Sequence, residues 1–286
     1  MSFPAPPMPD VPAEQRAETT TWPRYEDVTQ DGRLLPIAVP NHMAGIWQAL
    51  AQGTHAKTTM ASGVIPILTR MTMECDEARI RVDRQMATTS AFELAHSVDA
   101  SGEVNRVYMN LWASIAGVPG RVRDTAPDAA RVPCGRIFAE HTFTKLFAPP
   151  DQRKVTSLPN AGVPPTRYAP AAAIDLPEGA TWLDEVSPDP TPVIFTLDQT
   201  DSNQHVNSLV YLRIFLDAAQ RRFATLGRKL NIASRSLDIT YRKPCFAGDH
   251  ARIDLRAFSI GDAIGAAGSV IGDDNKPRCS VRAIFR

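Results

Sequence analysis

Length, composition and charge leave room for two ordinary domains and argue against several classes of protein. The chain has 286 residues, 43% of them hydrophobic, and its 31 basic residues balance 31 acidic ones to a formal net charge of zero. Proteins that bind nucleic acids usually carry a clear basic excess, so this balance argues against that class. No apolar run approaches the roughly 20 residues of a membrane-spanning helix, and the N-terminus lacks the apolar segment of a secretory signal.

The cysteines predict neither a disulfide framework nor a metal site. Cys75, Cys134, Cys245 and Cys279 lie far apart and form no CxxC pair, which is typical of reduced cytosolic thiols. The glycines of 261–268 lack the strand-to-helix context of a phosphate loop. We therefore expect a cytoplasmic protein with no metal, no cofactor, and neither a membrane nor a nucleic acid as partner.

The first part of the chain predicts a leader followed by one domain. Residues 1–20 are polar and rich in proline, and we expect them to form a flexible leader. Within the predicted N-terminal domain, 21–117, apolar side chains at helical spacing predict a helix over 41–50. Alternating or β-branched apolar runs predict strands at 22–28, 64–73, 78–82, 92–98 and 107–115.

A Pro-rich segment separates this domain from the rest of the chain. More than half of the 24 prolines lie between positions 118 and 192. A connection of this length is unusual inside one compact domain and reasonable between two. We therefore predict a linker over 118–189 and a second domain over 190–286.

The second domain repeats the plan of the first. Sequence patterns predict a short strand, a long helix and then further strands, at 193–197, 205–226, 237–241, 253–257, 261–271 and 279–285. Two copies of strand, helix and about four strands, with little residue identity between them, indicate an internal structural repeat. One long helix beside a curled antiparallel sheet is an α+β design.

The chemistry is concentrated where this long helix begins. Asp201, Asn203 and His205 are spaced two apart in a polar loop between the predicted strand and the helix. The apolar side chains that follow at steps of three and four predict one buried helix face, namely Leu209, Leu212, Leu216, Ala219, Phe223 and Leu226. The free N–H groups and the dipole of a helix start can hold developing negative charge.

These residues also carry a family resemblance. The string DSNQHVNS at 201–208, followed by Tyr211, resembles the DxNxHVNN…Y signature of hotdog-fold acyl thioesterases, and most closely the acyl-acyl-carrier-protein (acyl-ACP) thioesterases. Those enzymes have two hotdog domains in one chain, each an antiparallel sheet wrapped around a central helix. The resemblance covers about residues 190–286, and over 22–117 it rests on the order of elements alone. It implies a tandem, or double, hotdog fold with a degenerate N-terminal site.

The resemblance assigns roles to individual residues. It implies that Asp201 is the catalytic carboxylate, as base or nucleophile, that Asn203 is an orienting amide and that His205 is the catalytic imidazole. Asp217 lies where the family has an acidic residue in the helix. We further expect the backbone N–H groups of Val206 and Asn207 to form the oxyanion hole. Tyr211, Asp217 and His42 are further candidates for contact with the substrate.

Two positions depart from the family pattern. The plant enzymes have a Glu-Cys pair on the next strand, and the corresponding segment here places Pro244 before Cys245. The second asparagine of the signature is Ser208. The first half has no HVN motif, so we expect one active site per chain.

We therefore predict an enzyme of fatty acid metabolism that hydrolyses acyl-CoA or acyl-ACP thioesters. The first alternative is a hotdog enoyl-thioester hydratase or dehydratase, whose motif generally has proline after the asparagine, where this chain has Gln204. The second is a non-catalytic protein that binds acyl thioesters, suggested by Pro244 and the degenerate first half. The sequence is compatible with a monomer and with a homo-oligomer.

Overall fold

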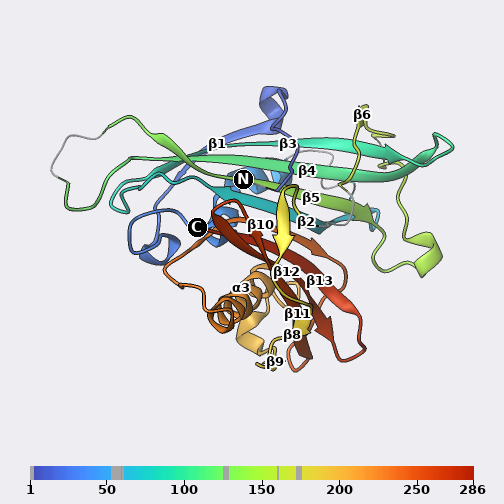
Figure 1. The fold of residues 1–286 in the computed structure, drawn as a ribbon. Coiled ribbons are helices and arrows are strands. Elements are labelled where there is room, and N and C mark those ends of the chain that lie inside the picture. The colour runs from blue at the N-terminus through green and yellow to red at the C-terminus, as the bar shows by residue number, and fades with distance from the viewer. Residues whose placement is uncertain (1–2, 53–58, 60, 125–128, 160, 172–175) are drawn as a thin grey trace.

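One continuous sheet runs through both halves of the chain (Figure 1). The computed structural model describes residues 3–52, 59, 61–124, 129–159, 161–171 and 176–286. Among these residues the sheet has the strand order β1-β3-β4-β5-β2-β10-β13-β12-β11-β7, and all neighbours along this path pair antiparallel. The short strand β6 (Thr166–Arg167) pairs with β3, and β7 (Ala180–Trp182), β8 (Ser187–Pro188) and β9 (Val193–Ile194) all pair with β11.

The N-terminal half packs a short helical segment against long strands. The 3-10 helix η3 (Pro36–Met43) leads into α1 (Ala44–Gln52). The strands of this half are β1 (Arg16–Thr21), β2 (Ile65–Cys75), β3 (Met86–Val98), β4 (Val104–Gly117) and β5 (Val132–Thr144). The expected strands at 22–28 and 78–82 are wrong, since no strand forms at either place.

The C-terminal half has the same plan with a longer helix. Helix α3 (Ser208–Thr225) is followed by β10 (Ser234–Tyr241), β11 (His250–Ile260), β12 (Ala263–Gly272) and β13 (Pro277–Phe285). The first half orders its strands β3-β4-β5-β2, and the second orders its equivalents β11-β12-β13-β10. The repeat inferred from the sequence is therefore present in the topology.

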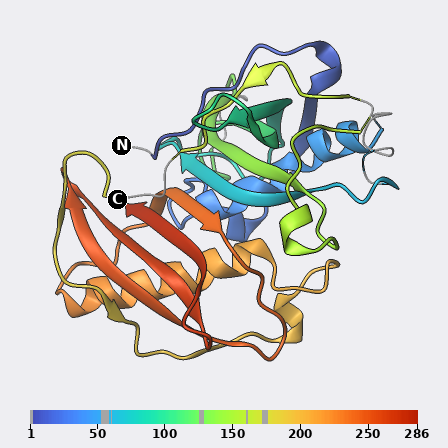
Figure 2. The ribbon, with the colours of Figure 1, turned by 90° about the vertical axis from the view of Figure 1, so that its right-hand side faces the viewer.

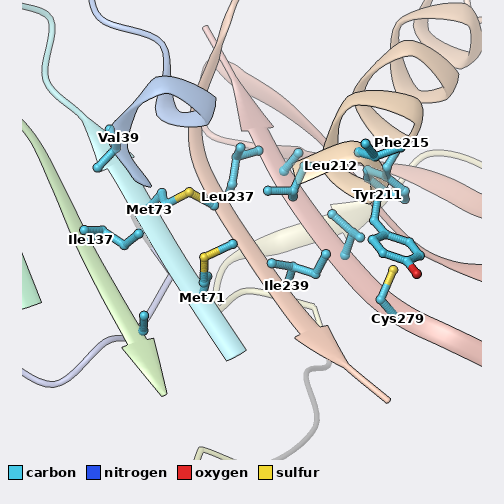
Figure 3. Packing of buried hydrophobic residues seen from close by; sticks show 14 of the residues in the cluster. Val39, Met71, Met73, Ile137, Tyr211, Leu212, Phe215, Leu237, Ile239 and Cys279 are labelled. Atoms are coloured by element: carbon cyan, nitrogen blue, oxygen red, sulfur yellow. The ribbon is translucent and has the colours of Figure 1, made fainter. Parts of the chain in front are cut away.

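The two halves meet where the first long strand of each, β2 and β10, pair antiparallel. On the inner face Met73 lies opposite Leu237, and Met71 lies opposite Ile239, so the core is continuous across the seam (Figure 3). The outer face carries a buried ion pair. Arg70 Nε donates to Asp238 Oδ1 over 2.8 Å, and these two side chains are only 5% and 0% exposed.

Helix α3 lies across the inner face of the C-terminal strands (Figure 2). Its buried side chains are Val210, Tyr211, Leu212, Phe215, Ala218, Ala219 and Phe223. Burying one large apolar side chain contributes about 1.5–3 kcal/mol. The predicted helix is confirmed, although three of the six expected core positions, Leu209, Leu216 and Leu226, are only partly buried.

The expected linker over 118–189 contains a central strand of the sheet. Strand β5 pairs with both β2 and β4, so the first unit extends to Thr144. Its outward side chains include Glu140, which accepts hydrogen bonds from Thr69 and from Tyr168. The strand was not predicted because it lies in the Pro-rich stretch of the sequence, and the strands that it pairs with are distant along the chain.

The later part of the linker is fastened to α3 by two arginines. Arg221 donates to both carboxylate oxygens of Asp189, and Arg222 donates to Asp184 Oδ2 over 2.6 Å. Asp184 also accepts the N–H of Ala257 on β11. The strap of residues 180–195 therefore bridges the helix and the edge of the sheet.

The expected flexible leader is ordered from residue 3 in the structure. Phe3 is buried, Pro6 O accepts the Trp112 indole N–H over 2.9 Å, and Arg16–Thr21 forms β1 beside β3. Proline has no backbone N–H, so a Pro-rich segment seldom pairs as a regular strand. Its carbonyl groups remain free to accept hydrogen bonds from side chains of the sheet.

The Arg70–Asp238 pair yields a stability prediction. Asp238→Ala leaves Arg70 buried without the carboxylate it pairs with, and we expect the free energy of unfolding to fall by about 3–5 kcal/mol. Urea denaturation measures this change. Asp254→Ala is the control, because its partner Arg252 is exposed and such pairs contribute about 1 kcal/mol or less. Equal losses in the two variants would contradict the structural role of the buried pair.

Candidate active site

The polar loop before α3 is a tight, closed turn. Strand β9 (Val193–Ile194) and the 3-10 helix η5 (Leu197–Gln199) lead into it. A β-bridge between Thr200 and Val206 closes the loop, and the Asp201 N–H donates to His205 O over 3.0 Å. Gln204 adopts a positive φ of 65° at its tip. The turn therefore brings the ends of the predicted Asp-x-Asn-x-His motif together.

The Asp201 carboxylate is oriented by its own loop. Its Oδ1 accepts the Asn203 N–H over 2.8 Å, and the same oxygen lies 3.8 Å from His205 Nδ1. The Asp201 and His205 side chains are 25% and 38% exposed, so solvent reaches both. The Asn203 residue is exposed, and the observed orienting contact comes from its backbone N–H.

The expected oxyanion donors are already engaged. The Val206 N–H donates to Cys245 O over 2.8 Å, and the Asn207 N–H donates to Gln199 O over 2.9 Å. Asn207 is instead the N-cap of α3, since its Oδ1 accepts the Leu209 N–H. The assignment of Val206 and Asn207 to an oxyanion hole is therefore corrected, because a donor already bound within the protein is not available to a substrate.

Tyr211 fastens the start of the helix to the loop between β10 and β11. It is 3% exposed, and its hydroxyl oxygen accepts the Cys245 N–H over 2.8 Å. Burial raises the pKa of the Tyr211 phenol. In addition, Tyr241 OH donates to Ser208 O over 3.0 Å. A buried hydroxyl that is already hydrogen-bonded within the protein is poorly placed to contact a substrate. We therefore assign these two tyrosines a structural role, in which they fix the position of the helix start.

The other two expected contact residues lie away from this loop. Asp217 is exposed near the middle of α3, about 15 Å along the helix from Asn207. His42 is buried in the N-terminal half, and its Nδ1 lies 2.8 Å from Thr21 Oγ1 and 3.3 Å from Thr88 Oγ1. Burial lowers the pKa of His42. The structure therefore brings together Asp201, Asn203 and His205, places Asp217 further along the helix, and gives His42 two threonine partners in the N-terminal half.

The segment that departs from the family pattern borders the site. Pro244 is exposed and precedes Cys245, whose carbonyl holds the Val206 N–H. Burial raises the pKa of the Cys245 thiol, so this thiol stays protonated near neutral pH and is a poor nucleophile.

The sequence patterns did not identify two exposed apolar side chains near the loop. Leu197 is 75% exposed at the start of η5, and Phe246 is 50% exposed directly after Cys245. The run 193–197 alternates like a strand, but its last residues turn into η5, and Leu197 therefore faces solvent. Within the described residues, no cluster of potential ligands could hold a metal ion.

Three solved structures share this fold over nearly the whole chain. They are an acyl-ACP thioesterase from Bacteroides thetaiotaomicron (15% identity, 96% of this chain and 98% of that chain, TM-score 0.62), a protein named as an oleoyl thioesterase from Lactobacillus plantarum (14%, 95% and 95%, 0.62) and the 12:0-ACP thioesterase from Umbellularia californica (14%, 97% and 99%, 0.56). The tandem hotdog fold predicted from the sequence is confirmed.

Comparisons by sequence find no counterpart. No protein-family model and no curated protein matches the chain. Across the described part of the chain, no helix is long and apolar enough to cross a bilayer.

The contacts of Tyr211 lead to a prediction that separates a structural role from substrate binding. Tyr211→Phe removes the acceptor of the buried Cys245 N–H, and we expect the free energy of unfolding to fall by about 1–3 kcal/mol. Chemical denaturation measures the change. Tyr25→Phe is the control, since Tyr25 is 78% exposed. Unchanged stability together with weaker substrate binding would instead assign Tyr211 to the substrate.

Proposed function

We propose that this protein hydrolyses acyl thioesters to a carboxylic acid and a free thiol, with Asp201 as the central catalytic group. The observation that carries the proposal is the fixed Asp201 carboxylate, 3.8 Å from His205 at the start of the buried helix α3. It is supported by the fold, which three structures named as thioesterases share over almost their entire length.

Asp201 has one oxygen for orientation and one for chemistry. Oδ1 accepts the Asn203 N–H, whereas no hydrogen bond to Oδ2 exists within the described residues. Oδ2 either takes a proton from the attacking water or attacks the thioester carbonyl itself. In the general-base route the tetrahedral intermediate collapses by breaking the C–S bond, and the leaving thiolate takes the proton that Asp201 removed from water. In the nucleophilic route C–S cleavage leaves an acyl-Asp201 anhydride and a thiolate that is protonated by solvent, and a water molecule then hydrolyses the anhydride to the free acid and restores Asp201. His205 positions the water or polarises the carbonyl.

A different backbone group supplies the oxyanion donor. Val206 and Asn207 are excluded by their internal hydrogen bonds. The N–H of Ser208, the first residue of α3, donates no hydrogen bond to any described residue. It sits at the positive end of the helix dipole, where a developing negative charge is stabilised. We therefore assign the oxyanion contact to Ser208 N–H.

The surroundings of the loop suit an acyl thioester. Leu197, at the start of the helix that leads into the loop, and Phe246, next to Cys245, offer exposed apolar surface against which an acyl chain or a pantetheine arm can pack. Both acyl-CoA and acyl-ACP remain candidate substrates. The carrier protein is favoured by two of the similar structures, which are named as ACP thioesterases.

We place one such site in each chain. The position before α1 that corresponds to the catalytic loop is occupied by η3, and its His42 is buried with two threonine partners. A histidine enclosed in this way is not available to a substrate. The first half therefore acts as the structural partner of the second.

Non-catalytic binding of acyl thioesters is the second candidate function. It is favoured by Pro244, which stands where the family has a carboxylate at the border of the site. It is also favoured by the backbone N–H groups of Val206 and Asn207, which already donate hydrogen bonds within the protein. Binding of an acyl-CoA by well-folded protein, without any thiol release, would select this candidate.

The role of Asp201 can be tested with an isosteric substitution. Asp201→Asn keeps an oxygen that can accept the Asn203 N–H, so the loop is preserved while the base or nucleophile is lost. We expect thiol release to slow by about 10²–10⁴-fold. The assay is release of thiol from acyl-CoAs and acyl-ACPs of short, long and aromatic acyl groups. The control Asp273→Asn changes an exposed aspartate in the turn between β12 and β13. Equal rates for the Asp201 variant and the wild type would refute the assignment.

A further inference from the structure

A hollow lies on the outer face of the C-terminal sheet, opposite α3. It has a volume of about 470 Å³ and is bounded by β10–β13 and by linker residues between 176 and 186. This size is in the range of small-molecule sites. We propose that this hollow binds a small organic anion with an apolar body, such as a medium-chain carboxylate or alkyl phosphate.

The hollow is separate from the candidate active site because the sheet lies between them. On β10, Tyr241 points inward and donates to Ser208 O at the start of α3. Its neighbours Thr240 and Arg242 line the outer hollow, as expected from the alternation of side chains along a strand. A ligand bound there contacts neither Asp201 nor His205.

The wall of the hollow is basic. It contains three arginines, Arg242, Arg256 and Arg282, and no carboxylate. Among the described residues, Arg242 and Arg256 form no ion pair with an acidic side chain. The buried carboxylate of Asp238 lies 3.6 Å from the Arg282 guanidinium and also accepts a hydrogen bond from Arg70. The acid on β11, Asp254, is engaged by Arg252.

Stacking on Trp182 holds the Arg256 side chain in place and leaves its guanidinium N–H groups available. Its guanidinium carbon lies 3.2 Å from the centre of the Trp182 ring, in a cation–π stack. Stacking fixes the plane of the guanidinium and leaves its N–H groups pointing outward along the plane. Such a fork is suited to bidentate recognition of a carboxylate or a phosphate.

A row of hydroxyls adds further polar contacts at the floor. Thr240, Ser280 and Ser269 lie side by side in register on β10, β13 and β12. The hydroxyls of Ser269 and Ser280 are 3.1 Å apart, so one donates to the other, and the accepting hydroxyl can turn its own proton toward an anion. Three adjacent strands thus present hydroxyls beside the arginines.

Apolar side chains lie among the arginines. Leu176, Trp182 and Ala267 line the hollow and pack on a buried cluster that includes Phe3 and Phe258. Ala267 lies in register between Arg256 and Arg282, and Trp182 stacks under Arg256. The site is therefore amphipathic, with apolar surface directly beside the charged groups. An inorganic anion would satisfy only the charged groups, and an uncharged lipid only the apolar surface.

Equilibrium dialysis with four probes tests this assignment. We expect decanoate, decyl phosphate or both to bind, and inorganic phosphate and decanol to bind at least tenfold more weakly, because phosphate lacks the apolar chain and decanol lacks the charge. The ratio between decanoate and decyl phosphate identifies the preferred anionic group. No binding of either at millimolar concentration, or equal binding of decanol, would overturn the proposal.

Three variants locate the binding. Arg242 is exposed, so Arg242→Glu is not expected to disturb folding and should weaken binding at least tenfold, about 1.4 kcal/mol. Arg256→Gln should have a similar effect. The control Arg252→Gln alters an exposed arginine on the same strand, outside the hollow, and should bind like wild type. Affinity that survives both Arg242→Glu and Arg256→Gln would place the ligand elsewhere, the candidate active site included, and refute the outer-face site.

Discussion

The burial of one face of α3 against the C-terminal strands is the constraint on which the rest of the site depends. Phe215, Ala219 and Phe223 are fully enclosed, so the helix cannot shift along the sheet without opening a cavity. Its first turn is then fixed by polar contacts. Tyr211 holds the Cys245 N–H, and the Cys245 carbonyl holds the Val206 N–H. The loop that carries Asp201 and His205 is thereby built on a rigid support.

The same sheet separates two environments with different chemistry. Its inner face is apolar and continuous across the β2–β10 seam, from Met71 and Met73 to Leu237 and Ile239 (Figure 3). Its outer face carries ion pairs and hydroxyls, and these are covered only in part by the N-terminal residues and the linker. Alternation along each strand therefore allows one sheet to support a candidate catalytic loop on one side and an anion site on the other.

Several features of this protein could be predicted from local sequence because they depend on short-range patterns. The long helix follows from the periodicity of its apolar residues, and the internal repeat follows from the order of elements. The juxtaposition of Asp201 and His205 also follows locally, since a five-residue turn before a helix brings its two ends together. The resemblance to hotdog thioesterases rested on this segment and predicted the fold of the whole chain.

Other features depend on contacts between distant parts of the chain. Strand β5 falls in the expected linker because it lies in the Pro-rich stretch 118–192, with Pro133 inside it and Pro149 and Pro150 shortly after it. Its pairing with β2 and β4 depends on residues that are distant in the chain. The engagement of the Val206 N–H depends on Cys245, almost forty positions away. No local pattern signals such a bond. The exposure of Leu197 likewise depends on the residue at which strand β9 ends. The ends of strands and helices are harder to predict from sequence than the elements themselves.

Product analysis in isotopically labelled water tests the central claim most directly. Purified protein would be incubated with an acyl thioester in H₂¹⁸O, and the acid and thiol would be analysed by mass spectrometry. For hydrolysis, we expect a free acid that carries solvent ¹⁸O, formed in equal amount with free thiol. A thioester that gains the elements of water and keeps its C–S bond would identify a hydratase and contradict hydrolysis. Recovery of unchanged thioester from every donor would refute catalysis of thioester hydrolysis by this protein.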